Sequence, residues 1–282
     1  MARASPLPTA PRERLLPTSL AALALVLLAG LFAPILSPHE PNATNLLNGL
    51  EPPVWLGGSW THPLGTDRLG RDLLSRCLYG IRTSVGIALV GLFVSTALGT
   101  AVGLLAGLGG KLADRVSMML VDVFIALPNL LLILTGIALL GTDVWVLVVL
   151  IGVVRFETYA RVVRGQVLHL RELGFVEASR ALGAGPVRVA LGHVLPNLAS
   201  PLVVLVTLNF PGVLLMESAL SFLGVGVQPP LASLGRMVGD GRGHLTDAWW
   251  LAVMPALLIV AITLSMQLIG DALRDRIDVR GD

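Results

Sequence analysis

Residues 83–109 read TSVGIALVGLFVSTALGTAVGLLAGLG, a stretch of 27 residues that contains no charged side chain. An α-helix needs about 20 apolar residues to cross the hydrocarbon core of a bilayer. Exposing an uncharged apolar block of this length to water on the surface of a soluble protein would be unfavourable. This segment therefore predicts a membrane-spanning helix, and the bilayer is the solvent in which the rest of the chain has to be interpreted.

Five further apolar blocks occur along the chain. Only 13% of the 282 residues are charged and 54% are hydrophobic, whereas a soluble domain carries about 25% charged residues. One block contains a single charge, Asp122, and the shortest extends past Arg155, whose long side chain can reach the headgroups. We predict an all-α polytopic membrane protein with six transmembrane helices, the further five lying over residues 18–36, 116–140, 144–154, 198–216 and 248–270.

Basic residues indicate the orientation of these helices. If the N-terminus is cytoplasmic, the inner segments hold 14 of the 20 basic residues, as the positive-inside rule favours. The first block is longer than the core of a signal peptide, so an uncleaved helix is expected. We predict that both termini lie inside, with a first helix and outer loop in residues 1–80, a core of five helices in residues 81–275 and a tail in residues 276–282.

Several classes of function lack the residues that they need. The net charge is +2 and no basic run interleaves with aromatic residues, so nucleic-acid binding is not expected. One cysteine, Cys77, permits no intrachain disulfide and no CxxC metal site. Lys111 is the only lysine and Leu112 follows it, so the chain has no P-loop of its own for ATP. We expect energy to come from a partner or from an ion gradient.

Covalent chemistry and metal binding are not expected either. The sequence contains no G-x-S-x-G and no H-E-x-x-H, which argues against an intramembrane hydrolase. None of the five histidines has a partner at ligand spacing along the chain. We therefore predict no catalytic residue, no metal and no cofactor in this chain, which is not expected to be an enzyme.

The loop at about 157–197 is the most informative connection. Apolar residues spaced four, three, four and three apart continue the fourth helix as an amphipathic rod: Phe156, Ala160, Val163, Val167 and Leu170. Glu157 and Arg161 are expected to pair on its polar surface. A short helix over about 175–182 follows and is stopped by Gly183-Ala184-Gly185, after which Pro186 begins another. Such a projection is either a docking element for a partner or a cap on the helix bundle.

Three segments of this loop carry a recognisable motif. Glu177-Ala178-Ser179, Gly183 and His193-Val194-Leu195-Pro196 resemble the EAA motif of ABC importer permeases, E-A-A-x3-G-x9-I-x-L-P, with every spacing matched. Ser179 stands in place of the second alanine and His193 in place of the isoleucine. Four other segments resemble the oligopeptide/dipeptide branch of this family: residues 62–67, 70–72, 221–230 and 270–275.

The resemblance implies a type I ABC importer permease fold in the inner (cytoplasmic) membrane. Such a chain forms half of a translocation path for peptides with a second homologous permease subunit, and an extracytoplasmic binding protein delivers the substrate. Its short helix sits in a cleft of a cytoplasmic ATPase subunit, which binds the ATP. The coupling residues implied are Glu177, Ala178, Ser179, Arg180, Gly183 and Ala184. Similar permeases move nickel complexes or other small solutes, so peptides are the favoured substrate and not the only one.

An ion-coupled secondary transporter is the main rival class, because intramembrane ionisable residues are its usual mark. Asp122 lies about two turns from Lys111 and Arg115, which favours a place near the inner interface. Glu217 can line the cavity, pair with an arginine or lie at the outer boundary, and boundary or structural pairing ranks first. Both are possible residues of the translocation path.

Small residues and prolines predict how the helices pack. Four of them recur every four residues in the second helix, which allows a close helix contact: Ser95, Gly99, Gly103 and Gly107. Pro128, Pro211 and Pro255 are expected to kink their helices, because proline removes a backbone hydrogen bond.

Overall fold

The computed structural model describes residues 12–278, which are helical apart from their connections and one isolated bridge between Thr66 and Asp72. These residues form two compact units, one of residues 12–87 and 210–278 and the other of residues 88–209. Two long helices belong to both: α3 (Leu73–Leu108) and α10 (Leu195–Phe222). The predicted boundary after residue 80 falls inside α3.

All six predicted apolar blocks form helix, which confirms the all-α polytopic class. Within the described residues, three helices are long and apolar enough to cross a membrane: α3, the run Val187–Phe222 that contains α10, and α12 (Trp250–Asp278). A fourth span results if the bent pair α4 (Gly110–Ala126) and α5 (Asn129–Leu140) is counted as one. The remaining apolar helices, α1 (Arg12–Leu31) and α6 (Val144–Val154), are shorter.

The third predicted block is not one continuous span. The chain turns by 91° between α4 and α5. Leu127 ends α4 in an extended conformation (φ −102°, ψ 138°) and Pro128 precedes α5. Proline disfavours helical geometry in the residue before it and donates no backbone hydrogen bond. The predicted kink at Pro128 is therefore a break, whereas α10 and α12 continue through Pro211 and Pro255.

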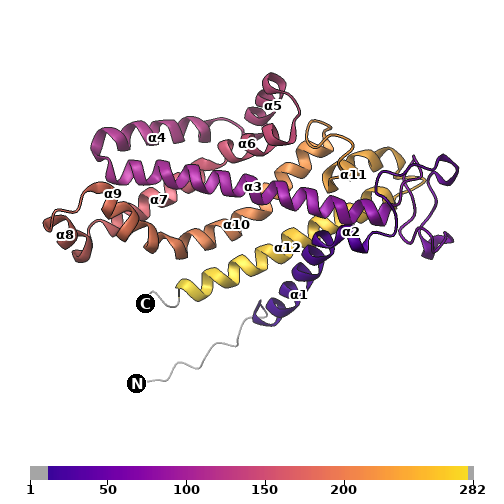
Figure 1. Cartoon of the computed structure of the whole chain (residues 1–282), viewed down its shortest axis with the longest axis horizontal. Coiled ribbons are helices and arrows are strands. Elements are labelled where there is room, and N and C mark those ends of the chain that lie inside the picture. The colour runs from indigo at the N-terminus through magenta and orange to yellow at the C-terminus, as the bar shows by residue number, and fades with distance from the viewer. Residues whose placement is uncertain (1–11, 279–282) are drawn as a thin grey trace. The chain divides into compact units, whose positions relative to one another are not determined.

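In the first unit, α1 lies alongside α12 (Figure 1). The short helix α11 (Leu234–Gly241) also packs on α12 and approaches α3 at Gly80, where an added Cβ would lie 3.2 Å from a Leu234 methyl. Six buried side chains pack together in this part of the unit: Leu73, Cys77, Met237, Ala248, Trp250 and Leu251. Between α2 (Ala33–Leu36) and α3 the chain is irregular except for two short 3-10 turns, Leu46–Asn48 and Val54–Leu56.

In the second unit, the glycine stripe of α3 lies directly against α7 (Phe156–Leu170). An added Cβ on Gly103 would lie 2.7 Å from the Val163 Cβ, and Gly99 and Gly107 face Tyr159 and Val167 in the same way. The prediction of a close contact through small residues is confirmed. Helix α5 packs on α6, and α4 packs on α7.

The amphipathic rod is confirmed as α7, and all five residues that predicted it are buried. The ion pair predicted on its polar surface is wrong. Glu157 is only 6% exposed, and Arg161 instead donates to the Asp122 carboxylate at 2.8 Å. The i,i+4 spacing places two residues close together on a helix, but it does not require that both side chains face solvent.

Candidate ATPase-coupling site and transport groove

Helix α8 (Gly174–Ala181) lies where the short loop helix was predicted. It ends at Ala181, and Gly183 follows with a φ of +88° in the left-handed region that glycine enters without steric penalty. The Ala184 N–H donates to the Ser179 carbonyl at 3.1 Å, which is the closing hydrogen bond of a Schellman motif. The stop predicted from Gly183 is therefore confirmed, and α9 (Pro186–Val189) begins at Pro186 as expected.

A buried aliphatic cluster fixes α8 to the rest of its unit. Val176 is the α8 member and is fully buried. The other members come from α7, α9, the π-helical turn Ala190–Val194 and α10: Val163, Val167, Leu170, Val189, Val194 and Leu198. Burying a valine side chain stabilises a fold by about 1.5–3 kcal/mol. Helix α8 is thus held by packing and is not a loose tether.

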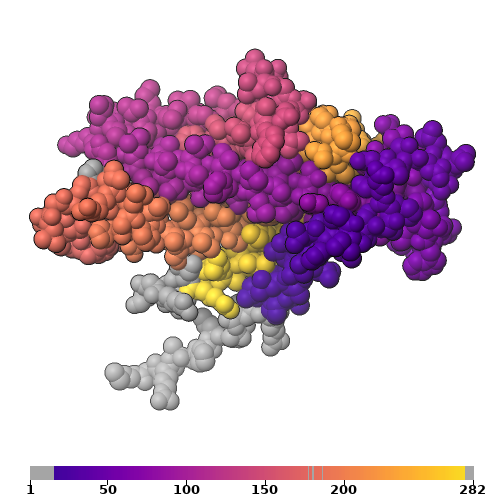
Figure 2. All heavy atoms as spheres, in the orientation of Figure 1, coloured from indigo at the N-terminus to yellow at the C-terminus, as the bar shows by residue number. Residues whose placement is uncertain are grey.

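Other side chains of this segment are apolar and exposed. Leu182 is 90% exposed, and three further side chains are also open to solvent: Phe175, Val187 and Leu191. Val187 and Leu191 line an open groove of about 610 Å³ together with Gly183, Gly185 and Arg188. In the space-filling view, α8 and α9 form the outermost part of their unit (Figure 2). Clustered exposed apolar side chains are typical of a surface that binds another protein.

The two departures from the EAA motif contact each other. The Ser179 hydroxyl and the His193 Nε2 lie 3.0 Å apart, which is hydrogen-bonding distance. The Phe175 ring also meets the His193 ring edge-on, with centroids 6.2 Å apart. Each departure is visible in the sequence, but their pairing is not predicted by it. The available signal was that both replace an apolar residue with one that can form a hydrogen bond.

The other predicted coupling residues lie on the same segment. Ala178 is exposed on α8, and Ala184 is half-buried against the aliphatic cluster. Glu177 and Arg180 lie within α8, and their side chains are outside the described part of the structure. The fold therefore gathers the six predicted positions into one helix and the turn that follows it.

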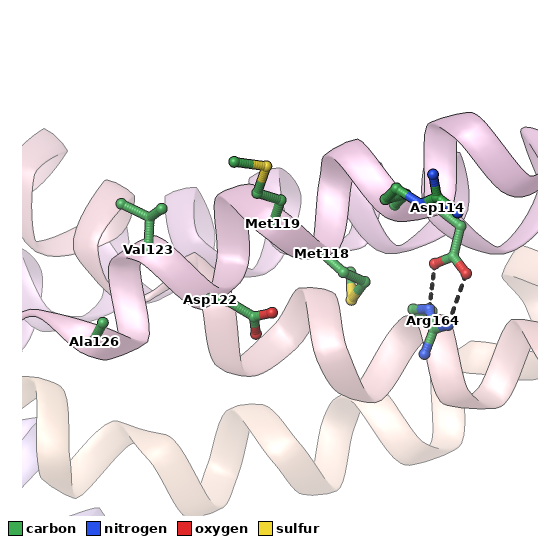
Figure 3. A pocket seen from close by; sticks show the side chains of 8 residues that line it. Asp114, Met118, Met119, Asp122, Val123, Ala126 and Arg164 are labelled. Atoms are coloured by element: carbon green, nitrogen blue, oxygen red, sulfur yellow. Dashed lines mark hydrogen bonds and ion pairs between the residues drawn. The ribbon is translucent and has the colours of Figure 1, made fainter.

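Asp122 lies beside an open groove of about 680 Å³ along α4. Its carboxylate accepts from Arg161 at 2.8 Å. At the other end of the groove Asp114 and Arg164 form a two-pronged ion pair, in which one N–O distance is 2.7 Å (Figure 3). The rest of the lining is apolar or basic: Arg115, Met118, Met119, Val123 and Ala126. Both acidic side chains of the groove are thus paired with arginines of α7.

Glu217 lies inside the first unit and lines neither groove. It is fully buried, and Ser221 donates to its Oε1 at 2.7 Å while Ser218 lies 3.4 Å from its Oε2. The hydroxyls of Ser84 and Ser233 also face it. Among the described residues it has no arginine partner. The predicted pairing with an arginine is therefore not seen among the described residues, and serine hydroxyls surround the carboxylate instead.

Neighbouring backbone groups make this serine cluster a connection between segments. The Val227 N–H donates to the Ser221 hydroxyl at 3.1 Å, and the Leu234 N–H donates to the Ser84 hydroxyl at the same distance. The cluster thereby joins α3, α10 and the start of α11. A buried carboxylate that accepts several hydrogen bonds avoids much of the penalty of burial.

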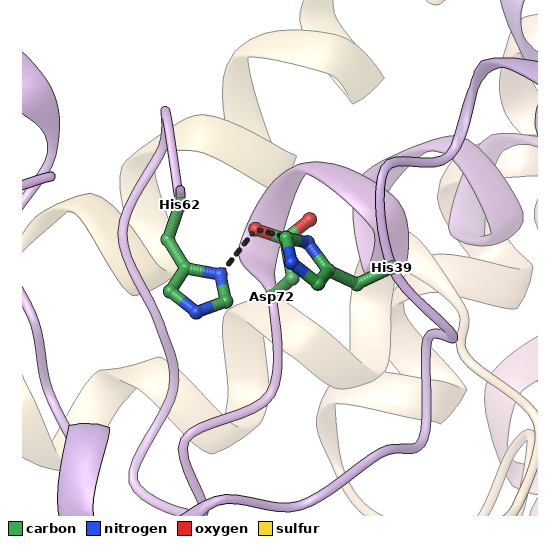
Figure 4. A group of neighbouring side chains, drawn as sticks. All are labelled: His39, His62 and Asp72. Atoms are coloured by element: carbon green, nitrogen blue, oxygen red, sulfur yellow. Dashed lines mark hydrogen bonds and ion pairs between the residues drawn. The ribbon is translucent and has the colours of Figure 1, made fainter. Parts of the chain in front are cut away.

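Histidine spacing along the chain predicted no metal ligands, yet the fold brings two histidines together. His39 and His62 both lie beside Asp72, just before α3 (Figure 4). The sequence does not predict this group, because its members are separated by 23 and 10 positions in irregular chain, where no helical or strand period relates them.

Known proteins match the chain over most of its length. Residues 99–279 match the family described as binding-protein-dependent transport system inner membrane component. The di/tripeptide transport system permease protein DppC of Pseudomonas aeruginosa (strain UCBPP-PA14) is 41% identical over 90% of this chain and 84% of that protein. The dipeptide transport system permease protein DppC of Haemophilus influenzae is 36% identical over 90% and 86%, and the probable D,D-dipeptide transport system permease protein DdpC of Escherichia coli K12 is 36% identical over 93% and 86%.

A solved structure also matches. A chain of the MetNI methionine ABC transporter in an inward-facing conformation aligns with a TM-score of 0.57 and 22% identity, over 70% of this chain and 94% of that chain. This likeness supports the fold alone, and it confirms the importer-permease fold that the EAA motif implied. With a family match over more than half of its length and relatives above 30% identity, the chain belongs to the binding-protein-dependent transport system inner membrane components.

Proposed function

We propose that this chain is the permease subunit of an ABC importer for peptides and that α8 couples it to a separate ATPase subunit. The peptide assignment is supported by the relatives, whose names describe dipeptide, di/tripeptide and D,D-dipeptide transport. Because the sequence contains no P-loop, we expect the partner subunits to bind the ATP.

One observation carries the coupling role. Helix α8 is anchored by the buried Val176, while exposed apolar side chains lie on the helix at Phe175 and in the turn that follows it at Leu182. A cap that only completed the bundle would turn such side chains inward. An anchored helix with an exposed apolar edge suits a partner's groove, and the anchoring transmits the partner's movement into α7 and α10.

The proposed assembly has four kinds of component. A second homologous permease completes the translocation path, a cytoplasmic ATPase binds α8, and an extracytoplasmic binding protein delivers the peptide. The orientation with both termini inside places α8 in the cytoplasm. The α4 groove, with Asp122 paired to Arg161, is our candidate for the part of the path contributed by this chain.

Replacing Leu182 by glutamate tests the docking surface. Because Leu182 is 90% exposed, Leu182→Glu leaves the fold intact and places a charge where an apolar contact is proposed. We expect the purified variant to lose its ATPase subunit during co-purification and to lose peptide-stimulated ATP hydrolysis in proteoliposomes. Leu47→Glu is the matched control, since Leu47 is 95% exposed and lies before α3. Equal retention of the ATPase by both variants would refute the docking role of α8.

Energy coupling separates the proposal from an ion-coupled transporter. Peptide uptake into vesicles should stop when ATP is depleted and should continue when the proton gradient is dissipated. The opposite pattern would contradict an ATP-driven importer. Replacing peptide by a nickel complex in the same assay tests the alternative substrate directly.

A further inference from the structure

His39, His62 and Asp72 form a compact group that the transport role does not use. The His62 Nδ1 lies 3.0 Å from the Asp72 Oδ1, and the His39 Nδ1 lies 4.0 Å from the same oxygen. The two imidazole rings lie side by side on the carboxylate, with centroids 4.6 Å apart and an angle of 36° between their planes (Figure 4). One ligand atom from each residue lies within 4.8 Å of the other two.

The Asp72 carboxylate is held so that one oxygen faces the histidines. Its Oδ2 accepts from the Ser75 N–H at 2.7 Å and from the Ser75 hydroxyl at 2.6 Å. This oxygen is therefore used at the start of α3, and Oδ1 is left to the imidazoles. Hydrogen bonds that orient a ligating carboxylate from behind are a regular feature of metal sites.

Nearby arginines do not neutralise Asp72. Arg71 and Arg76 both approach Asp67 instead, at 2.7 and 3.6 Å. The Asp72 side chain is fully buried, and within residues 12–278 its only ion-pair partners are the two histidines. A buried carboxylate requires a positive charge or full hydrogen bonding. Ser75 supplies two hydrogen bonds to Oδ2 and His62 lies at hydrogen-bonding distance from Oδ1, so a cation beside Oδ1 would add the missing positive charge.

A protonated histidine accounts for only part of this geometry. One imidazolium at His62 would satisfy Oδ1, but the His39 Nδ1 is buried and has no hydrogen-bond partner among the described residues. Protonating both rings would place two positive charges side by side. A single ion shared by the three side chains uses the unpaired nitrogen, supplies the charge and explains why both rings face the same oxygen.

The distances and donor types indicate the class of ion. Zinc binds histidine nitrogen and carboxylate oxygen at about 2.0–2.2 Å with tetrahedral angles, which places neighbouring ligand atoms about 3.3–3.5 Å apart. The observed 3.0 and 4.0 Å separations bracket that value. Two imidazoles and one carboxylate suit zinc-class transition metals better than calcium or magnesium, which prefer oxygen ligands only.

We propose that His39, His62 and Asp72 bind one zinc-class divalent ion and leave a fourth position for water. The ion joins three segments of the first unit: the link that follows α2, the turn that contains His62 and the start of α3. His39 is the more open of the two histidines, with 35% of its side chain exposed, so the ion can enter from that side. This site is independent of the coupling role of α8.

Metal retention by the full chain tests the site. The chain is purified in detergent with an affinity tag that contains no histidine, incubated with a small excess of ZnCl2, passed over a desalting column and analysed for bound zinc. We expect one zinc per chain, and competition with a chromogenic chelator gives the affinity. His39→Gln and His62→Gln should each weaken binding by more than the about 10–100-fold typical of losing a supporting residue. His244→Gln, a half-exposed histidine of the same unit, is the control and should bind as the original chain does.

Cobalt substitution gives a second measurement, because the spectrum of the original chain reports its metal ligands directly. The original chain loaded with Co2+ should show visible absorption bands of histidine-ligated cobalt, and the His39→Gln/His62→Gln double variant should not. Circular dichroism checks that each variant keeps its helix content. The proposal is overturned if the original chain retains no zinc, or if the double variant retains as much zinc as the original chain.

Discussion

Replacing Gly103 by alanine tests the close contact between α3 and α7. An added Cβ would lie 2.7 Å from the Cβ and Cγ1 of Val163 and 2.8 Å from the Ala160 carbonyl oxygen, whereas carbon atoms in contact prefer about 3.5–4.0 Å. Overpacking of this kind costs about 1–3 kcal/mol. Alanine in place of glycine within a helix stabilises it by about 0.5–1 kcal/mol, so the net effect of Gly103→Ala should lie between neutral and a destabilisation of about 2.5 kcal/mol.

Gly165→Ala separates the steric effect from the effect on helix propensity. Gly165 lies in the middle of α7, is exposed, and an added Cβ there meets nothing within 4 Å. It should therefore stabilise the chain by about 0.5–1 kcal/mol, and the two variants should differ by the steric cost alone, about 1–3 kcal/mol. The free energies of unfolding can be compared by titrating detergent-solubilised chain with SDS and following helical circular dichroism. Equal stabilities of the two variants would show that α3 and α7 do not approach as closely as described.

Three further predictions concern the buried carboxylate and the coupling segment. Glu217→Leu should destabilise the chain more than Glu217→Gln in the same SDS titration. Glutamine keeps an acceptor for the surrounding serines, whereas each hydroxyl left unpaired by leucine costs about 1–3 kcal/mol. The reverse order would contradict a structural role for Glu217. Gly183→Ala should lower peptide-stimulated ATPase activity more than Gly185→Ala. Of these two glycines, only Gly183 has a positive φ, and an alanine in the left-handed conformation costs about 1–2 kcal/mol. Equal activities of the two variants would mean that this turn conformation is not required. Ser179→Ala should destabilise by about 0.5–1.5 kcal/mol and should show a coupling energy with His193→Ala in a double-mutant cycle, whereas additive effects would mean that their hydrogen bond contributes nothing.

Sequence periodicity predicted those parts of the fold that depend on one element at a time. The apolar positions of α7 repeat with the helical period, and all five are buried. The glycines of α3 repeat every four residues and therefore share the helix face that meets α7. The turn after α8 was predictable because glycine at 183 permits a conformation that other residues adopt only with strain.

Partners distant in the sequence could not be predicted in this way. Arg161 has a carboxylate four residues away at Glu157, yet it pairs with Asp122, 39 positions earlier. Glu157 faces the buried side instead. The carboxylate with which Arg161 pairs depends on how α4 packs against α7. The spacing of residues within one helix does not contain that information.

The sequence also did not predict the angle of the break at Pro128. Hydropathy averaged over residues 116–140 describes one apolar block, and the proline adds the expectation of a kink. A proline within a helix can produce either a modest bend or a complete interruption. The packing of α5 on α6 is compatible with the 91° turn. This packing is a tertiary contact, which hydropathy along the chain does not describe.

The length of α3 has a consequence for the whole chain in its lipid environment. Its 36 residues extend about 54 Å at 1.5 Å per residue, and the hydrocarbon layer is about 30 Å thick. Even a tilt of about 40°, the upper end of the usual range, leaves about 41 Å along the membrane normal. At least about 11 Å of α3 must therefore lie among headgroups or in water. Reconstitution in lipids of different acyl-chain length should change the inclination of this helix without any mutation, so bilayer thickness is an experimental variable for its orientation.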